Sequence, residues 1–396
     1  MRFLLAVMQF PTEPGRSYLT TELALALVAA GHEVEVLQLD WDAAPTAKED
    51  PPRIWRGIRV VRCTPRRLAG LGGALSHAGK FILSGRHAAR VAKESLELER
   101  FDVFITWAPL VALAPLVRMV RRAGVPRRLL IIWDFFPDHY HQIGRIPGGL
   151  PFWIAKVWEQ SLMADFTAIL CTLPKNVAYL HRAFRVPAGQ KALAMPTWTD
   201  VTPVVSQDRT AVRRAHGLPE DGPIAAFGGN LVAGRGFDQM LAAAELGRRK
   251  GSPVKFLFVG DGRLGPRVRA EAEVWDNVIW RAPMPRERLL ELLGACDVGM
   301  VATVPGVTSF STPAKALDYL RAGIPSVVAI EPGSEFAELL ERYGVARSVA
   351  FGDADGFLAA AEALAAGPSV AEAAARCLDE VFHVRHTVAT IEAAAA

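Results

Sequence analysis

Residues 224–238 read IAAFGGNLVAGRGFD, an apolar run that leads into a glycine-rich segment. The apolar run has the length of a buried strand, and residues 236–246 have the periodicity of a helix. A glycine-rich turn between a strand and a helix brings backbone N–H groups against a phosphate. A tight strand-to-helix turn without a ligand has the same composition. The lysine and Ser/Thr of a P-loop are missing, so the segment indicates an α/β unit and disfavours an ATPase.

Strand-length and helix-length runs alternate on both sides of this segment, which is typical of doubly wound parallel α/β sheets. We expect strands and helices, in chain order, at 2–8, 17–30, 33–39, 101–106, 128–133, 166–171, 254–259, 264–273, 277–280, 285–294, 298–302, 313–322 and 326–330. After the first strand, residues 9–15 read QFPTEPG. The GxGxxG pattern is absent there, so a dinucleotide-dependent dehydrogenase is disfavoured.

The chain has 396 residues, more than a single hydrophobic core usually organises. A polar stretch punctuated by prolines, from residue 194 to about 208, predicts a linker. We therefore expect an N-terminal domain at residues 1–200 and a second domain at residues 201–380. A C-terminal helix at residues 381–396 is expected to pack back on the N-terminal domain.

The net charge of +4 is unevenly distributed. Residues 1–200 hold 25 Lys and Arg against 17 Asp and Glu, giving +8, and the remaining 20 and 24 give −4. A basic first half fits an anionic partner there, such as nucleic acid, anionic lipid or a pyrophosphate-bearing acceptor. A solvated, arginine-rich surface has the same composition. No RNA-binding motif or recognition-helix pattern occurs, so nucleic acid is disfavoured.

The four cysteines form no CxxC pair, so neither a disulfide framework nor a zinc site is indicated. No apolar run reaches the length of about 18 residues that spans a bilayer, and residues 1–10 are expected to be a buried strand. Two Asp-x-Asp triplets, at residues 40–42 and 353–355, are too common by chance to indicate a metal. We expect no metal and no other cofactor.

A second motif, residues 308–325, reads TSFSTPAKALDYLRAGIP. Ser311 or Thr312 is expected to cap a helix that Gly323 ends. The free amides at such a helix start favour a diphosphate. Lys315 and Asp318 share one helical face, which allows the cation to meet phosphate while the carboxylate accepts bonds from ribose hydroxyls. An ordinary capped helix with a local ion pair fits the same residues.

The pairing of these two segments resembles the retaining GT-B glycosyltransferases of family 4. Looser matches run through almost the whole chain, at Gly15, 31–34, 101–103, 164–166, 259–262, 295–298 and 323–325. The resemblance implies two Rossmann-like domains that face each other across a cleft. It also implies sugar transfer from a nucleotide diphosphate donor with retention and without a metal, the donor being held mainly by the C-terminal half.

Several departures are similar to a subgroup of bacterial exopolysaccharide and O-antigen assembly transferases. Where the commoner pattern has an arginine and a lysine, this chain carries Asn230 and Arg235. The two paired glutamates of the commoner pattern correspond here to Phe310 and Asp318. Lys315 is expected to replace the missing cation. The donor-binding residues that the resemblance implies are Gly15, Gly229, Asn230, Arg235, Ser311, Thr312, Lys315 and Asp318.

Residues 133–139, WDFFPDH, resemble that subgroup's acidic loop, at the position where other members place an active-site histidine. Asp134 or Asp138 is therefore expected to face the donor sugar or the acceptor hydroxyl, where a carboxylate orients or deprotonates that hydroxyl. A helix cap or a structural carboxylate is the other interpretation. The expected catalytic residues are Asp134, Asp138, Arg235 and Lys315.

The resemblance also implies a glycan or a polyprenyl-pyrophosphate-linked acceptor. Residues 66–86 mix cations with apolar side chains, so we expect peripheral attachment there to an anionic membrane at its cytoplasmic face. A helix packed on the N-terminal core with its arginines in water is the alternative. A catalytically inactive nucleotide-binding partner subunit and a GT-B-like nucleotide-sugar epimerase are the alternatives to a transferase.

Overall fold

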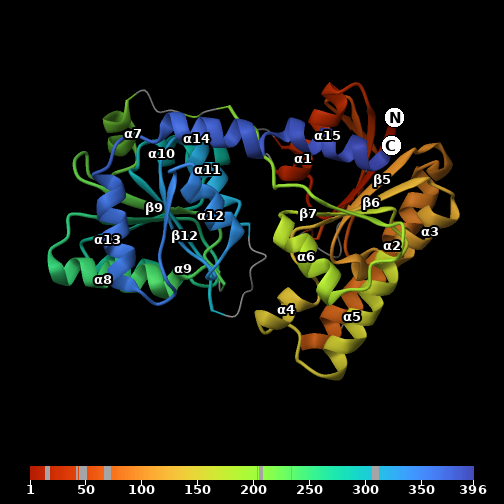
Figure 1. Ribbon diagram of the computed structural model, residues 1–396, viewed down its shortest axis with the longest axis horizontal. Coiled ribbons are helices and arrows are strands. Elements are labelled where there is room, and N and C mark those ends of the chain that lie inside the picture. The colour runs from red at the N-terminus through yellow and green to blue at the C-terminus, as the bar shows by residue number, and fades with distance from the viewer. Residues whose placement is uncertain are drawn as a thin grey trace. The chain divides into compact units, whose positions relative to one another are not determined.

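The computed structural model describes residues 1–13, 18–41, 43, 51–66, 73–202, 204, 208–232, 234–305 and 312–396, without the side chains of residues 73–78. The chain forms two compact units. Unit 1 comprises Met1–Trp198 and Val384–Ala396, and unit 2 comprises Thr199–His383. The chain therefore passes between the units twice, and the C-terminal helix belongs to unit 1 (Figure 1).

Unit 1 is built on an eight-stranded sheet of order β3-β4-β2-β1-β5-β6-β7-β8. Its strands are β1 Arg2–Val7, β2 Glu33–Leu39, β3 Arg53–Trp55, β4 Ile58–Cys63, β5 Val103–Trp107, β6 Arg127–Ile132, β7 Ala168–Cys171 and β8 Lys191–Ala194. Its helices are α1 Leu19–Ala29, α2 Gly73–Ser95, η1 Leu98–Arg100, η2 Leu110–Ala112, α3 Ala114–Arg122, α4 Asp138–Gln142, α5 Leu150–Met163, α6 Pro174–Ala183 and α15 Val384–Ala395.

The strands of unit 1 are parallel except β3, which pairs antiparallel with β4 at the sheet edge. Alternate strand residues form one core face with α1 and α15. Helices α2 and α3 pack on each other on the opposite face of the sheet (Figure 1). The strands expected in this half are all present, and β3, β4 and β8 were not expected. The 23-residue α2 overlaps the packed helix that was the alternative interpretation of residues 66–86.

Several hydrogen bonds tie α15 to the rest of unit 1. His32 Nε2 lies 2.8 Å from a carboxylate oxygen of Glu392. The Arg127 guanidinium donates to the carbonyls of Ala395 and Ala396, at 2.9 and 3.0 Å. Because the buried face of α15 also completes the core around β1 and α1, this helix is an integral part of unit 1.

Unit 2 is built on a six-stranded parallel sheet of order β11-β10-β9-β12-β13-β14. Its strands are β9 Ile224–Gly228, β10 Lys255–Val259, β11 Val278–Arg281, β12 Val298–Ala302, β13 Ser326–Ala329 and β14 Ala346–Ser348. Its helices are α7 Arg209–Ala215, α8 Phe237–Lys250, α9 Gly265–Val274, α10 Arg286–Gly294, α11 Lys315–Arg321, α12 Glu335–Arg342, α13 Ala354–Ala365, α14 Ala371–Cys377 and the π-helix η3 Leu378–Phe382.

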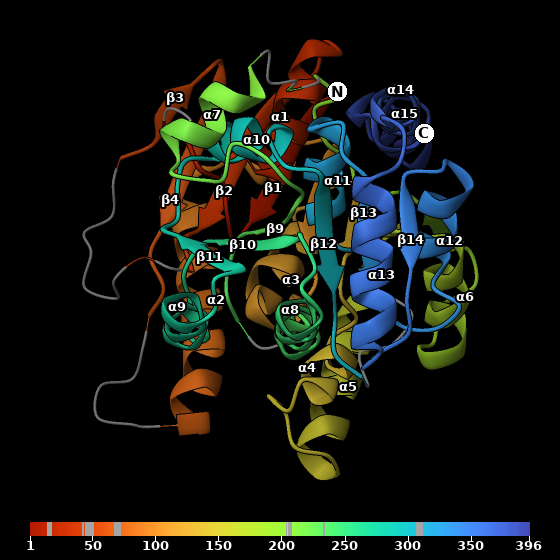
Figure 2. The same ribbon diagram turned by 90° about the vertical axis from the view of Figure 1, so that its left-hand side faces the viewer.

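Helices cover both faces of this sheet, so strands such as β9 and β12 are apolar and buried along their whole length. Helices α8, α9 and α13 form the core on one face. Helices α10 and α11 pack together on the other face, as Figure 2 shows. The result is two Rossmann-like units, each with its own core.

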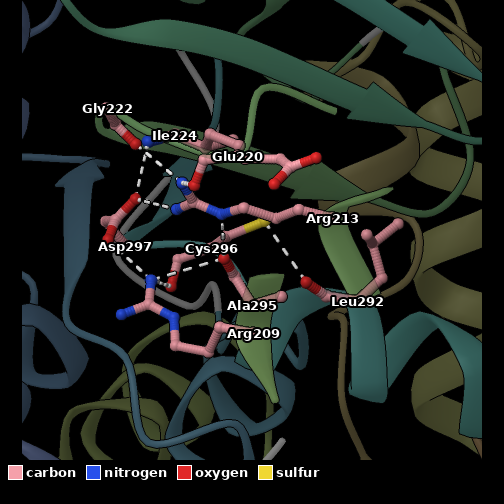
Figure 3. A network of polar contacts seen from close by, with 9 residues as sticks. All are labelled: Arg209, Arg213, Glu220, Gly222, Ile224, Leu292, Ala295, Cys296 and Asp297. Carbon is pink, nitrogen blue, oxygen red and sulfur yellow. Dashed lines mark hydrogen bonds and ion pairs between the residues drawn. The ribbon is translucent and has the colours of Figure 1, made fainter. Parts of the chain in front are cut away.

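A buried ion pair lies near the starts of β9 and β12 (Figure 3). Asp297 Oδ2 accepts from Arg213 Nη2 and from the Ile224 amide, both at 2.7 Å. The Arg213 guanidinium also donates to the carbonyls of Ala295 and Gly222, at 2.8 and 2.9 Å. One carboxylate thus joins the helix α7 to the strand β9.

Candidate functional site

The strand order of unit 2 reverses between β9 and β12, which are direct neighbours although β10 and β11 separate them in the chain. Ligands of doubly wound sheets bind beside the carboxyl ends of the strands at this switch point. The glycine-rich loop leaves β9 at Gly228 and enters α8 after Gly236. A side chain at Gly236 would place its Cβ 2.4 Å from that of Ala302, at the end of β12. The loop therefore lies across the switch point.

Two more glycines let a neighbouring loop pack against the glycine-rich loop. The Gly229 amide donates to Val259 O and the Leu231 amide to Asp261 O, both at 2.9 Å. Gly260 has φ +141°, and a Cβ there would lie 2.0 Å from Gly229 O. Any side chain at residue 260 would displace the glycine-rich loop, so backbone contacts hold the described part of this loop in place.

Lys315, the first residue of α11, extends its side chain to this loop. Its Nζ lies 4.8 Å from the ring centroid of Phe227. A Cβ on Gly229 would lie only 2.7 Å from the same Nζ, so the absence of a side chain at Gly229 leaves room for the ammonium. Burial and the repulsion of Arg235 lower the pKa of Lys315 to about 8, although Asp318 opposes the shift. The structure thus brings Gly229, Arg235 and Lys315 together.

The other expected donor residues differ in their surroundings. Asn230 and Arg235 have exposed side chains. Gly15 and Ser311 lie outside the described residues. Helix α11 begins at Lys315 with Ala314 rather than Thr312 as its N-cap, and the Ala314 side chain forms no capping hydrogen bond.

The ion pair between Lys315 and Asp318 that was the alternative interpretation of this motif is replaced by a pair between Asp318 and Arg286. Asp318 Oδ1 instead accepts from Arg286 Nη2 at 2.8 Å and from Arg286 Nε at 3.3 Å. Arg286 begins α10, and no motif in the sequence pointed to it. This pair leaves Asp318 as an oriented, half-buried carboxylate near Lys315.

The switch point of unit 1, between β1 and β5, has a pocket of about 250 Å³. Its walls include Tyr18, Trp41, Trp107, Trp133 and Tyr140. The rings of Trp107 and Trp133 lie 5.8 Å apart between centroids. Both indole N–H groups are buried, and neither has a hydrogen-bond partner among the described residues. Two residues of the aromatic wall thus carry buried indole N–H groups for which the described residues offer no partner.

Only one of the two expected N-terminal carboxylates is available beside this pocket. Asp134 is exposed and follows Trp133. Its charge acts on Tyr140 of the pocket wall, whose pKa is raised chiefly by burial and further by Asp134. Asp134 therefore lies near the pocket with an exposed side chain.

Asp138 has the structural role that was the alternative interpretation. Its Oδ2 lies 2.5 Å from Lys156 Nζ, and its Oδ1 accepts from the Tyr179 hydroxyl at 2.7 Å. These contacts join α4 to α5 and α6. Both oxygens thus have partners within unit 1, which favours the structural interpretation of Asp138.

The basic segment at residues 66–86 includes both packed and exposed side chains among its described residues. Lys80 is buried, and its Nζ donates to Trp41 O at 2.8 Å and lies 4.0 Å from the Trp41 ring centroid. Ser84 is buried and accepts from the Arg66 amide at 2.9 Å. Residues 67–72 and the side chains of residues 73–78 lie outside the description, so this part of the expectation is not examined.

Across the described ranges, no group of three or more His, Cys, Asp or Glu side chains could hold a metal ion. Of the two Asp-x-Asp triplets, Asp353 caps α13 by accepting from the Gly356 amide at 2.7 Å. Asp40 pairs with Arg62, and Asp42 is outside the description. Among the helices described, none is long and apolar enough to cross a membrane.

Known proteins match both halves of the chain. Residues 15–196 match the family described as "Glycosyl transferase 4-like domain", and residues 222–367 match "Glycosyl transferases group 1". The colanic acid biosynthesis glycosyl transferase WcaI of Escherichia coli K12 is 24% identical over 361 residues, 84% of each chain.

Two solved structures share the fold at low sequence identity. WaaG, a glycosyltransferase of lipopolysaccharide biosynthesis, has a TM-score of 0.67 at 14% identity, with 98% of both chains covered. The UDP-forming α,α-trehalose-phosphate synthase of Burkholderia xenovorans has a TM-score of 0.74 at 14% identity, with both chains covered completely. These similarities establish the GT-B architecture.

Proposed function

Since the chain is a glycosyltransferase of GT-B fold, we propose that it moves a hexosyl or related sugar from a nucleotide diphosphate donor to a glycan or polyprenyl-pyrophosphate-linked acceptor. We place this reaction in cell-surface polysaccharide synthesis, as the similarity to WcaI suggests. The proposal includes retention of configuration and independence of metals and other cofactors. It assigns the chain to family 4.

The observation that carries the proposal is the Lys315 ammonium beside the glycine-rich loop of unit 2. Two cations, Arg235 and Lys315, meet the negative charge that develops on the leaving diphosphate. A half-buried ammonium gains more from a phosphate than an exposed one, because less water competes for it. Asp318, oriented by Arg286, accepts from the ribose hydroxyls. Gly229 and Asn230 belong to the same glycine-rich loop.

For the acceptor we propose the aromatic pocket of unit 1. Sugar rings present C–H faces that pack on aromatic rings and hydroxyls that accept hydrogen bonds. As donors to those hydroxyls we propose the indole N–H groups of Trp107 and Trp133, which are buried and have no partner among the described residues. Asp134 near the pocket then orients or deprotonates the attacking hydroxyl. We further propose that this acceptor is at the cytoplasmic face of a membrane, to which the protein attaches peripherally.

Replacement of Asp318 tests the ribose assignment. We expect Asp318→Asn to lower kcat/KM for the donor by about tenfold, because hydrogen bonds to a charged group contribute about 1.5–3 kcal/mol. A donor whose ribose lacks its 2′- and 3′-hydroxyls is expected to lose about as much with the wild-type protein, and little more with Asp318→Asn. Normal turnover with a collapsed melting temperature would identify a structural carboxylate instead.

Replacement of Trp133 tests the acceptor pocket. Trp133→Phe keeps an aromatic wall but removes the indole N–H, so we expect acceptor kcat/KM to fall by roughly three- to tenfold for one lost hydrogen bond. Donor hydrolysis without acceptor is expected to stay unchanged. Trp275→Phe, in unit 2, is the matched control. Equal effects of both replacements on acceptor kinetics would contradict the assignment.

Compared with the commoner family pattern, this chain lacks one cation and one glutamate. A catalytically inactive subunit that binds the nucleotide is therefore the second candidate function. A donor-hydrolysis assay separates the two. We expect slow release of free sugar and nucleotide diphosphate from one donor class. A protein that binds the donor without any release, with or without acceptor, would be such a subunit.

A further inference from the structure

Helix α5 carries an unusual apolar surface. The side chains of Leu150, Trp153, Ile154 and Val157 are 66, 60, 50 and 48% exposed. They make up four of the eight exposed large hydrophobic side chains of the described chain. Their spacing of three, four and seven residues places them on one face of the helix, which we call the α5 apolar face. A cluster of this kind in water marks an interaction site.

The rest of the helix is firmly attached to unit 1. Glu159, Leu162 and Met163 are buried. The Glu159 carboxylate accepts from the amides of Leu110 and Val111, at 2.8 and 3.1 Å. The α5 apolar face therefore belongs to a fixed, amphipathic helix whose opposite side is already packed.

The segment that carries this face is basic. Residues 134–199 contain six Lys and Arg against four carboxylates, and one of these, Asp138, pairs with Lys156. Glu159 is buried, and Asp165 lies 3.4 Å from the Arg121 guanidinium. The side chain of Arg145, five residues before α5, is exposed. The surface around the face thus favours an anionic partner.

Helix α6 brings further cations to this end of unit 1, where Figure 1 shows α4, α5 and α6 as neighbours. Lys156 of α5 lies 3.3 Å from the ring centroid of Phe184, which directly follows α6. Lys175, Arg182 and Arg185, on or just after α6, have exposed side chains. An apolar stripe containing a tryptophan, flanked by cations, has the composition of a helix that lies in a membrane interface.

We propose that the α5 apolar face is the surface by which this protein docks on an anionic lipid bilayer. Trp153 and its apolar neighbours enter the interface while Arg145 and the α6 cations meet lipid phosphates. A second copy of the chain fits less well, since a symmetric contact through this face would bring the same cations together. The inference rests on the proposed function in one respect, since a lipid-linked acceptor is the reason for this protein to dock on a membrane. It places the membrane contact on α5 rather than on residues 66–86.

Co-sedimentation with vesicles tests the docking surface. The full-length protein is mixed with phosphatidylcholine vesicles, with or without 30% phosphatidylglycerol added as the anionic lipid, at about 0.05 and 0.5 M salt. We expect binding to the anionic vesicles that weakens as salt screens the cations. Trp153→Ser with Ile154→Ser is expected to reduce the bound fraction at least tenfold. Ile82→Ser with Arg86→Ser, exposed positions on α2, is the matched control and should bind as the wild type does.

Two further readouts make the result decisive. Donor binding in solution, measured by calorimetry, is expected to be unchanged in the variant with Trp153→Ser and Ile154→Ser. This measurement distinguishes failure of the membrane proposal from failure of the proposed donor site. Size-exclusion chromatography is expected to give the same elution for variant and wild type. The proposal is overturned by absence of vesicle binding, by loss of binding in the α2 control alone, or by a wild-type dimer that the α5 variant dissociates.

Discussion

Lys315→Met is expected to lower kcat/KM for the sugar donor by roughly 100- to 1,000-fold, the loss that follows removal of one group that stabilises developing charge. Methionine keeps the length and apolar stem of lysine but cannot meet the diphosphate. Arg235 belongs to the glycine-rich loop but is exposed to water, so we expect Arg235→Ala to cost only about tenfold. Steady-state kinetics with varied donor concentration measure both effects.

The pH dependence identifies Lys315 as the source of this loss. Only the ammonium form meets phosphate, and its pKa in the free protein is about 8. Donor kcat/KM is therefore expected to fall as the pH rises through about 8. Lys315→Arg, which stays charged, should lose that fall. Lys250→Met, an exposed lysine of the same unit, is the control. Wild-type kinetics in Lys315→Met would exclude the proposed donor site.

Asp297→Ala is expected to destabilise unit 2 by about 3–5 kcal/mol, because it leaves the buried Arg213 guanidinium without its carboxylate. The Ile224 amide also loses its acceptor at the start of β9. For a unit of this size each kcal/mol lowers the melting temperature by about 2–4 °C, so the expected shift is on the order of 10 °C. Differential scanning calorimetry measures it directly.

Asp355→Ala is the control for this experiment. Asp355 pairs with Lys250, and their side chains are 70 and 56% exposed. Exposed ion pairs contribute about 0–1 kcal/mol, so the melting temperature should change by no more than a few degrees. Similar shifts for Asp297→Ala and Asp355→Ala would show that the buried network does not stabilise unit 2.

Most of the strands that were predicted from sequence are largely buried, since their apolar runs carry the signal. β2 and β12 were predicted at their observed bounds. The edge strand β3, Arg53–Trp55, was not predicted because it follows two prolines, faces solvent and has no apolar run. Helix α2 was considered only as the alternative for residues 66–86, because its residues 73–95 mix glycine, serine and cations with apolar residues.

The site residues were predicted only where a short motif carries them. Gly229, Arg235 and Lys315 come from such motifs, and the structure brings them together. Arg286 was missed because it lies 32 residues before Asp318, a separation with no local pattern. The pocket formed by Trp107 and Trp133 was missed for a similar reason, because only the pairing of β5 with β6 brings these two residues close.

Calorimetric titration with a panel of UDP-, GDP- and dTDP-sugars tests the central claim most directly. The account predicts that one donor class binds the wild-type protein and that Lys315→Met binds it at least about tenfold more weakly, without a change in melting temperature of the free protein. Failure of every nucleotide sugar to bind, or equal affinity in wild type and Lys315→Met, would contradict a donor site built on Lys315 and the glycine-rich loop.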